Sequence, residues 1–369
     1  CRGDERAFWL DKATSLPSVR INSFSYNDLE LIACGALSPL EGFLCRDDYN
    51  HVVELMRLAN GLPWPLPIVL GVTSDEADNC DVDAHVALKT EDNTIVAVML
   101  VQDKFVVDKE REAAKVFKTT DGNHPGVRAL RERGNVLLGG DVNILTMPTH
   151  RSAAAYRLTP AETRHAFEQH GWRRIASFHT RNPVHRAHEY LQKCALEICD
   201  GLLMHPMLDE EGDDIPPDVM IECYERLIEN YFPEERVMLS IFPAVNWYAG
   251  PREAVLHTIM RKNYGCTHMI IGRNHADVGT YYGPYEAQDI FRLFGPRELG
   301  ITTLMFEDAV YCRTCMGMAT HKTCPHSAEH HMMVSATRLR EMLRRGERPP
   351  KEVARPEAME PLLKAFNAS

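Results

Sequence analysis

The spacing of apolar residues divides the chain into a first part with short apolar runs and a second part in which two periods alternate. Before residue 149, apolar runs such as 67–72 and 94–101 are separated by polar, turn-rich pieces. Short runs bounded in this way are typical of strands. A mainly β domain with a few helices is therefore expected over 1–148.

From residue 150 onward, strand-like runs alternate with helix-like segments. The first helix is indicated by Thr159, Pro160 and Glu162, which suit the N-cap, the first helical position and the acid of a capping box. Further helices are expected over 183–198, 217–231, 251–264 and 285–293. Strands are expected over 175–178, 202–207, 237–242, 268–272 and 302–306. This alternation predicts right-handed βαβ units, and hence a parallel sheet with helices on both faces.

The predicted fold class is therefore α/β, with a central doubly wound domain over 149–310. A β-rich domain over 1–148 precedes it, and a small part over 311–369 follows it. That last part begins with a cysteine cluster, and helices are expected from Ser335 and from Pro356. In a doubly wound sheet, ligands bind beyond the carboxyl ends of the strands.

Composition and charge exclude several classes of protein. Apolar runs are all short of the 18 residues that a membrane span needs, so no span is expected. The formal net charge of −11 disfavours nucleic-acid binding, which needs a basic face, although a local basic pocket could still bind a small anion. Eleven cysteines, mostly scattered singly, do not form the framework of a small secreted domain. A reducing, cytoplasmic location with one metal site is expected.

Three of these cysteines lie close together in the C-terminal part. Cys312 and Cys315 form a Cys-x-x-Cys pair, Cys324 follows, and three histidines come after it: His326, His330 and His331. Three thiolates and one imidazole suit a tetrahedral structural Zn²⁺. The simpler alternative is a set of reduced free thiols.

The segment from Ser177 to His188 carries the richest chemistry. It lies where a predicted strand ends and a predicted helix begins, with Asn182 as the expected N-cap and Pro183 as the first helical residue. A helix start binds phosphate well, and Arg181 can bind an oxyanion with two hydrogen bonds. The alternative is a surface arginine beside a histidine that caps a carbonyl. The chain has no Gly-x4-Gly-Lys-[Ser/Thr] loop, so this turn is the candidate phosphate site.

The same segment resembles the Gln-Thr-Arg-Asn-Pro-x-His-Arg-Ala-His signature of the ATP sulfurylase (sulfate adenylyltransferase) family, which belongs to the His-x-x-His nucleotidyltransferases. Other segments resemble family motifs in the family's order: 28–30, 38–43, 124–126, 248–254, 271–276, 281–285 and 333–337. The resemblance covers nearly the whole chain. It implies an N-terminal domain of the PUA type, a central nucleotidyltransferase domain and a C-terminal zinc site with His331 as its fourth ligand.

The resemblance also implies an activity and roles for single residues. Sulfate would attack the α-phosphorus of ATP, which carries Mg²⁺, to give adenosine 5′-phosphosulfate and pyrophosphate. The implied catalytic residues are Thr180, Arg181, Asn182, His185 and His188. The implied ATP-binding residues are His179, Gly272, Arg273, Asn274, His275 and Val334. The implied acceptor-binding residues are His179, Arg181, Ala276 and Asp277. A homodimer or a higher homo-oligomer is expected, and the physiological direction stays open.

Several residues depart from the family pattern at or beside the expected acceptor pocket. His179 stands where the family has Gln, Asn274 where it has Asp, and Asp277 where it has Gly. Trp247 and Asn246 stand where the family commonly has Arg and Met. A carboxylate that points into such a pocket would repel sulfate. Two alternatives to an ATP sulfurylase follow: an adenylyltransferase for another oxyanion or an organic sulfonate or phosphonate, and a noncatalytic nucleotide-binding protein.

Overall fold

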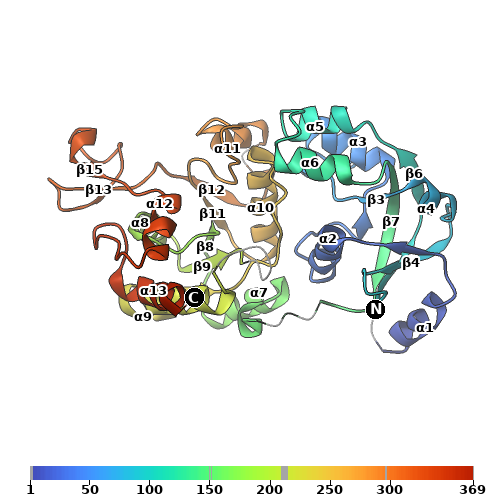
Figure 1. The fold of residues 1–369 in the computed structure, drawn as a ribbon, viewed down its shortest axis with the longest axis horizontal. Helices are drawn as coiled ribbons and strands as arrows, with labels where there is room; N and C mark the ends of the chain where they lie inside the picture. Colours follow the sequence, from blue (N-terminus) through green and yellow to red (C-terminus); the bar gives the residue numbers. More distant parts are fainter. Residues whose placement is uncertain (1–2, 149, 151, 209–214, 296, 369) are drawn as a thin grey trace. The chain divides into compact units, whose positions relative to one another are not determined.

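A computed structural model describes residues 3–148, 150, 152–208, 215–295 and 297–368. The chain forms two compact units, each assembled from separate stretches of sequence (Figure 1). Unit 1 comprises Cys1–Thr149, Ala244–Asn263 and Asn274–Leu299. Unit 2 comprises His150–Pro243, Tyr264–Arg273 and Gly300–Ser369. After unit 2 has begun, the chain therefore returns to unit 1 two times.

Unit 1 contains a sheet of seven strands that is centred on its longest strand, β7. The strands are β1 (Ser18–Arg20), β2 (Gly42–Phe43), β3 (Leu70–Val72), β4 (His85–Lys89), β5 (Ile95–Leu100), β6 (Asp103–Val106) and β7 (Val136–Ile144). β7 pairs antiparallel with β2, β3, β5 and β6, whereas β1 pairs parallel with β4. Both apolar runs chosen from the sequence supply strands, β3 and β5.

Several helices of unit 1 begin at a side chain that caps them. They are α1 (Gly3–Ala13), α2 (Ser23–Ala33), α3 (Arg46–Leu55), α4 (Ser74–Asp78), α5 (Lys109–Val116), α6 (Pro125–Glu132), α10 (Pro251–Asn263) and α11 (Glu286–Asp289), with the 3₁₀ turn η3 (Ile290–Leu293). The Asn22 side chain caps α2 by accepting from the Ser25 N–H at 2.9 Å. In α10, the buried Arg252 guanidinium donates to the carbonyls of Val52, Val53 and Pro65, which ties this later segment to α3.

Unit 2 contains a parallel sheet of five strands in the order β10-β9-β8-β11-β12. The strands are β8 (Ile175–Thr180), β9 (Gly201–Pro206), β10 (Val237–Leu239), β11 (His268–Ile271) and β12 (Thr302–Met305). From β8 the chain builds β9 and β10 on one side of the sheet. It then returns to place β11 and β12 on the other side of β8. The strand order therefore reverses between β8 and β11.

The helices of unit 2 follow the predicted pattern closely. They are α7 (Pro160–Gln169), α8 (Arg186–Leu196), α9 (Pro217–Tyr231), α12 (Ala336–Arg344) and α13 (Pro356–Ala368). The predicted capping box is present, since Thr159 Oγ1 accepts from the Glu162 N–H at 3.3 Å and the Glu162 carboxylate accepts from the Thr159 N–H at 2.7 Å. Ser335 caps α12 in the same way at Arg338.

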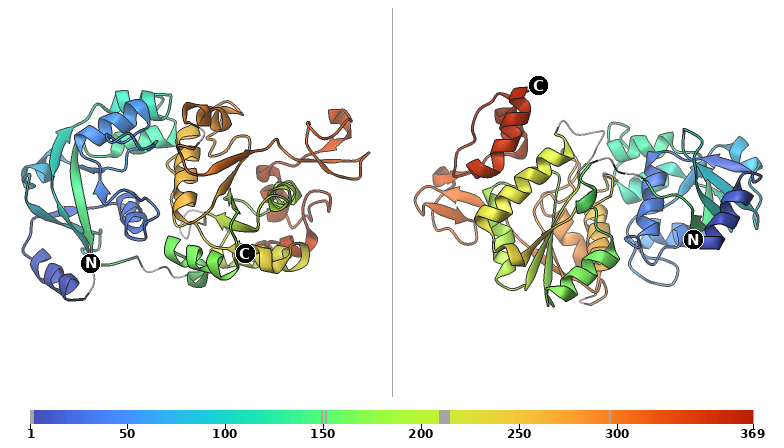
Figure 2. Two further views of the ribbon diagram at one scale, coloured as in Figure 1. Left: turned by 180° about the vertical axis from the view of Figure 1, so that it is seen from behind. Right: turned by 90° about the horizontal axis from the view of Figure 1, so that it is seen from below.

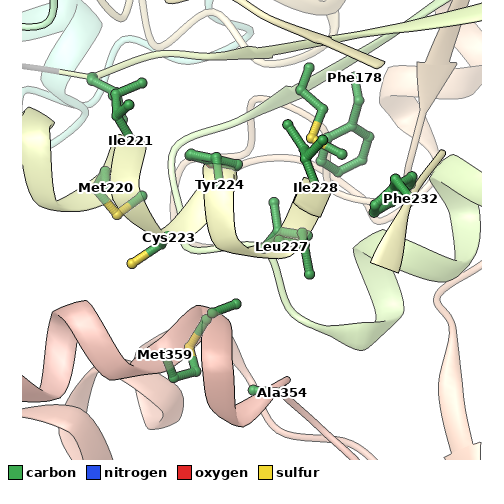
Figure 3. Close-up of a cluster of buried hydrophobic side chains, with 14 of the residues drawn as sticks. Phe178, Met220, Ile221, Cys223, Tyr224, Leu227, Ile228, Phe232, Ala354 and Met359 are labelled. Atoms are coloured by element: carbon green, nitrogen blue, oxygen red, sulfur yellow. The ribbon is translucent and has the colours of Figure 1, made fainter. Parts of the chain in front are cut away.

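The core of unit 2 joins the sheet to α9 and α13, which lie side by side (Figures 2 and 3). Phe178 from β8 and Tyr224 and Leu227 from α9 are buried in it, and Met359 of α13 lies on the other side of α9 from Phe178 in Figure 3. Leu362 of α13 belongs to the same buried cluster. The far C-terminal helix is therefore part of the hydrophobic core of this unit rather than an appended tail.

We predict that Leu362→Ala lowers the free energy of unfolding by about 3 kcal/mol, because Leu362 is fully buried and the change leaves a cavity. Urea unfolding curves measure this loss. The exposed Lys364 on the same helix supplies the control, and Lys364→Ala should change stability by less than about 0.5 kcal/mol. Equal losses in the two variants would show that α13 does not contribute to the core.

A small antiparallel sheet precedes α12. It consists of β13 (Val310–Cys312), β14 (Gly317–Ala319) and β15 (His331–Met332), in the order β14-β13-β15. The Arg186 guanidinium of α8 lies 5.6 Å from the centre of the Tyr311 ring, which links this sheet to the rest of unit 2. Across the described residues, no helix combines the length and the apolar character that a membrane span requires.

Candidate functional site

The turn between β8 and α8 differs in one respect from the sequence prediction. α8 begins at Arg186 with His185 as its N-cap, three residues later than predicted, and Asn182 is not the cap. The peptide groups of Asn182 are bound elsewhere: its N–H donates to Thr180 Oγ1 at 3.1 Å, and its carbonyl accepts from the Tyr224 hydroxyl at 3.0 Å. These two bonds hold residues 181–185 in a loop, so the helix starts only after it.

The loop is held in place through its backbone rather than through the Arg181 side chain. The guanidinium of Arg340, on α12, donates to the Arg181 carbonyl at 3.1 Å. Within the described residues, the Arg181 side chain itself makes no hydrogen bond and no ion pair. A half-buried arginine without a carboxylate partner can bind an incoming anion without first breaking an existing ion pair.

His185 and His188 stack on each other at the start of α8. Their ring centroids are 3.9 Å apart and the ring planes differ by 23°. Burial lowers the pKa of His185 to about 4. Burial and the neighbouring His185 together lower the pKa of His188 well below its usual value. Both rings are therefore neutral near pH 7, each with one N–H donor, and an approaching phosphate would favour their protonated forms.

We predict that acid destabilises unit 2 through His185. The pKa of a histidine is about 6.5 in the unfolded chain and, for His185, about 4 in the folded chain. The unfolded chain therefore binds more protons between these values, so the stability is complete above pH 6.5 and falls as the pH decreases towards 4. At about 1.4 kcal/mol per pH unit, the loss is about 3 kcal/mol.

Urea unfolding at pH 7 and at pH 4 measures this effect. The wild-type chain should lose about 3 kcal/mol more than His185→Gln between the two values, because glutamine does not titrate. The same loss in both proteins would contradict a neutral, buried imidazole at this position.

Gly272 and Arg273 come directly after β11, at the same end of the sheet as the β8–α8 turn. β8 and β11 are neighbouring parallel strands, so Thr180, the last residue of β8, and Gly272, the first residue after β11, both lie at the carboxyl ends of the strands. The space beside Gly272 is open, since an added Cβ would meet no atom within 4 Å. Arg273 bonds Asp308 at 3.0 Å. This edge is also the position where the strand order reverses, which is the usual ligand site of such sheets.

Two further predicted residues of unit 2 contact its interior. His179, near the end of β8, lies with its ring edge-on to Phe242 at 6.1 Å between centroids. Val334, just before α12, is half-buried and packs against the main hydrophobic cluster.

The predicted residues from Asn274 to Asp277 belong to unit 1. Asn274 and Ala276 both adopt left-handed backbone conformations, with φ of 54° and 56°. Asp277 is half-buried; burial raises the pKa of its carboxyl, and Oδ1 accepts from the Val278 N–H at 2.7 Å. His275 lies close to His257 of α10, a residue that was not selected from the sequence.

Four groups in the C-terminal part could hold a metal ion. One donor atom from each of Cys312, Cys315, Cys324 and His326 lies within 4.8 Å of the other three. The Cys315 and Cys324 sulfurs are 3.8 Å apart, and His326 Nδ1 lies 3.3 to 3.6 Å from the three sulfurs. In a tetrahedral zinc site with bonds of about 2.3 Å to sulfur and about 2.0 Å to nitrogen, two sulfurs lie about 3.8 Å apart, and a sulfur and a nitrogen lie about 3.6 Å apart. The donor set therefore fits zinc.

The geometry favours His326 over the expected His331 as the fourth donor. His331 Nε2 contacts Cys324 Sγ alone, at 3.4 Å, as a hydrogen-bond partner of one thiol would. His330 is bound elsewhere, because its Nδ1 lies 3.0 Å from the Thr314 hydroxyl.

The fold and this edge of the sheet together define a class. A doubly wound parallel sheet that places a free arginine and two neutral histidines at its reversal point is a nucleotide-binding α/β unit of the His-x-x-His type. Comparison with known proteins identifies the family within this class. The family model described as ATP-sulfurylase matches residues 154–365, and a PUA-like domain model matches residues 1–147. The chain belongs to the ATP-sulfurylase family.

Individual relatives agree with this assignment. The chain is 52% identical to a sulfate adenylyltransferase of Symbiobacterium thermophilum over all of its length and 94% of the relative's length. It is 49% identical to a sulfate adenylyltransferase of Halothermothrix orenii, over 99% of this chain and 96% of the other. Among solved structures, a hexameric APS kinase from Thiobacillus denitrificans matches 98% of this chain with a TM-score of 0.75 and 25% identity. This chain spans 66% of that protein.

Proposed function

We propose that this chain transfers AMP from ATP to sulfate and releases pyrophosphate. The observation that carries the proposal is the turn at the reversal point of the parallel sheet: it holds the stacked, neutral pair His185 and His188 and also Arg181, whose side chain makes no hydrogen bond or ion pair among the described residues. The identity of about 50% with curated sulfate adenylyltransferases supports the same reaction.

In the proposed reaction, a sulfate oxygen attacks the α-phosphorus in line with the bond to the β-phosphate. That bond breaks, and its electron pair leaves on pyrophosphate. Arg181 would hold sulfate against the α-phosphate, and Thr180 and Asn182 would orient the phosphates. His185 and His188 would donate to oxygens whose negative charge grows in the transition state. His179, Ala276 and Asp277 would line the acceptor pocket.

ATP would be positioned by the residues of the family motif, Gly272, Arg273, Asn274 and His275, and Val334 would lie against the adenine. Mg²⁺ would arrive on the triphosphate and neutralise part of its charge, since the metal-binding cluster found among the described residues is the separate Cys/His group.

The identity of the acceptor is the finer question. The residues His179, Trp247 and Asp277 differ from the family pattern, and the half-buried carboxyl of Asp277 has a raised pKa. These features favour, as a second candidate, transfer to another oxyanion or to an organic sulfonate or phosphonate.

One assay separates these functions. Pyrophosphate release from Mg²⁺-ATP is measured with sulfate, selenate, molybdate and methanesulfonate in parallel. Sulfate-dependent release confirms the proposal, and release with another acceptor but not with sulfate supports the second candidate. ATP binding by calorimetry without release from any acceptor would instead indicate a noncatalytic nucleotide-binding protein.

We further propose a structural Zn²⁺ held by Cys312, Cys315, Cys324 and His326. The four donors would close the coordination shell, so the ion would stabilise the β13–β15 sheet without touching substrate. Because three thiols must stay reduced to bind it, a cytoplasmic location fits the site. Domain boundaries near residues 148 and 310 and a homodimer or higher oligomer complete the proposal, and light scattering tests the oligomer.

A further inference from the structure

Two strained turns of unit 1 lie on either side of one buried carboxylate. The first is the turn from Tyr248 to Gly250, with φ of 58° at Tyr248 and 52° at Gly250. Left-handed conformations cost energy at residues other than glycine, so they persist where the surroundings hold them. The Glu253 carboxylate accepts from the N–H groups of Trp247 at 3.2 Å and Ala249 at 3.0 Å. The Tyr282 hydroxyl donates to the Tyr248 carbonyl at 3.2 Å.

The second strained turn surrounds His275. The residues on both sides of it, Asn274 and Ala276, are left-handed. The Asn274 N–H donates to the Pro284 carbonyl at 3.0 Å, and the Asp277 N–H donates to the Asn274 carbonyl at 3.1 Å. This turn therefore presents the half-buried imidazole of His275 from a rigid backbone.

His257 lies on α10, four residues after Glu253, and connects the two strained turns. Its Nε2 lies 3.5 Å from Glu253 Oε1, and its Nδ1 lies 3.4 Å from His275 Nε2. Glu253 and His257 are each 1% exposed, so both groups interact in a medium of low dielectric constant. A row of carboxylate, imidazole and imidazole thus runs from the interior of the unit to a partly exposed ring.

The contacts of this row favour one arrangement of protons when both rings are neutral. Glu253 Oε1 and His257 Nε2 make an electrostatic contact rather than a hydrogen bond, and the negative carboxylate favours the tautomer with the proton on Nε2. The Nδ1 of His257 is then an acceptor, and His275 must carry its proton on Nε2 to donate to it.

We propose that His257 is a positioning residue that fixes the tautomer and orientation of His275, with Glu253 as the fixed charge behind it. This inference rests on the proposed function. In that function, the row couples the Trp247–Ala249 backbone beside the acceptor pocket to a nucleotide-binding histidine. One buried carboxylate thereby shapes both halves of the site.

Nitrogen-15 NMR of histidine rings tests the proposal in the unliganded chain, with His275→Asn used to assign the His275 signals. In the wild type, His275 should show a single tautomer with its proton on Nε2, and so should His257. In His257→Phe, which removes both nitrogens but keeps a ring, the His275 shifts should move to the average of two tautomers. His257→Gln, which can donate to Glu253, should shift His275 less than His257→Phe does.

His124 supplies an internal control in the same unit. Its Nδ1 accepts from the Val127 N–H, and its Nε2 lies 3.2 Å from the Tyr282 hydroxyl, so its tautomer is set without His257. Unchanged His124 signals show that the variant is folded. An averaged His275 in the wild type, or a proton on His257 Nδ1, overturns the proposal without any variant. A single His275 tautomer in folded His257→Phe also overturns it.

Kinetics supply a separate test that depends on the proposed function. His257→Phe should raise the KM for ATP about tenfold, with a smaller change in kcat, because positioned partners of binding groups act mainly on affinity. An unchanged KM would overturn the coupling to nucleotide binding. If the wild type shows no adenylyl transfer, the proposed function fails while the NMR result still decides the role of His257.

Discussion

Arg181→Ala is expected to lower kcat for pyrophosphate release about 10³-fold. Across the residues that the structure describes, the Arg181 guanidinium has no hydrogen-bond or ion-pair partner, and two neutral imidazoles lie in the same turn. In the proposed reaction it would face charge on both the acceptor and the α-phosphate, so its loss removes stabilisation that is strongest in the transition state. Arg181→Lys should recover only part of the activity, because an ammonium cannot bind an oxyanion with two parallel bonds.

The control for this variant is an arginine with a clear structural partner. Arg226 of α9 pairs with Glu222 one turn away, at 2.7 Å, and Arg226→Ala should leave kcat within about twofold of the wild type. Steady-state assays with saturating Mg²⁺-ATP and sulfate compare the wild type with Arg181→Ala, Arg181→Lys and Arg226→Ala. A kcat for Arg181→Ala near that of Arg226→Ala would remove Arg181 from the reaction.

The second large effect concerns metal content. Cys324→Ser is expected to reduce bound zinc from about one equivalent to nearly none. Cys324 Sγ contacts Cys315, His326 and His331, and a serine hydroxyl in its place is a poor zinc ligand. Without the ion, three remaining donors cannot hold the β13–β15 sheet together, so protease should cleave this part of the chain faster. Plasma emission spectroscopy measures the zinc, and limited proteolysis measures the order of the sheet.

Two histidine variants decide which imidazole binds the ion. His326→Ala should lose nearly all zinc, whereas His331→Ala should keep it with at most a tenfold weaker affinity, as expected for a partner that only hydrogen-bonds a ligand. Cys194→Ser, outside the cluster, is the control and should keep the full equivalent. Zinc loss in His331→Ala but not in His326→Ala would reverse this assignment.

Where the sequence prediction succeeded, local signals and the global fold agreed. The capping box at Thr159 and Glu162 starts α7 as predicted, and the alternation of strands and helices gives the parallel sheet of unit 2. The alternation alone does not give the reversal of strand order between β8 and β11, because that also requires knowing which strands pair with each other. Pairing depends on which faces of the helices are buried, and this is not encoded by any single segment.

The start of α8 shows why local signals can fail. Asn182 and Pro183 form a good helix start, but the Tyr224 hydroxyl donates to the Asn182 carbonyl and Arg340 donates to the Arg181 carbonyl, and these bonds hold the segment in a loop. These partners come from α9 and α12, far along the chain. A propensity of about 1 kcal/mol at an N-cap does not outweigh two such bonds.

The row of Glu253, His257 and His275 shows which part of the site could not be predicted from the sequence. Glu253 and His257 are four residues apart and share a helix face, a spacing that is visible in the sequence. The contact of His257 with His275 depends on the left-handed turn at Asn274 and Ala276, and alanine at the second of these positions does not predict such a conformation. The choice between His326 and His331 has the same origin, since only the folded sheet brings Nδ1 of His326 to three sulfurs.

The most direct measurement follows two labels into one product. The chain is incubated with Mg²⁺, ATP labelled with phosphorus-32 at the α-position and sulfate labelled with sulfur-35, and the nucleotides are then separated. The account predicts one compound that carries both labels in equal amounts, formed together with pyrophosphate and nearly absent with Arg181→Ala. Failure of the wild-type chain to place sulfur-35 on any nucleotide, while it still binds ATP, would contradict transfer to sulfate.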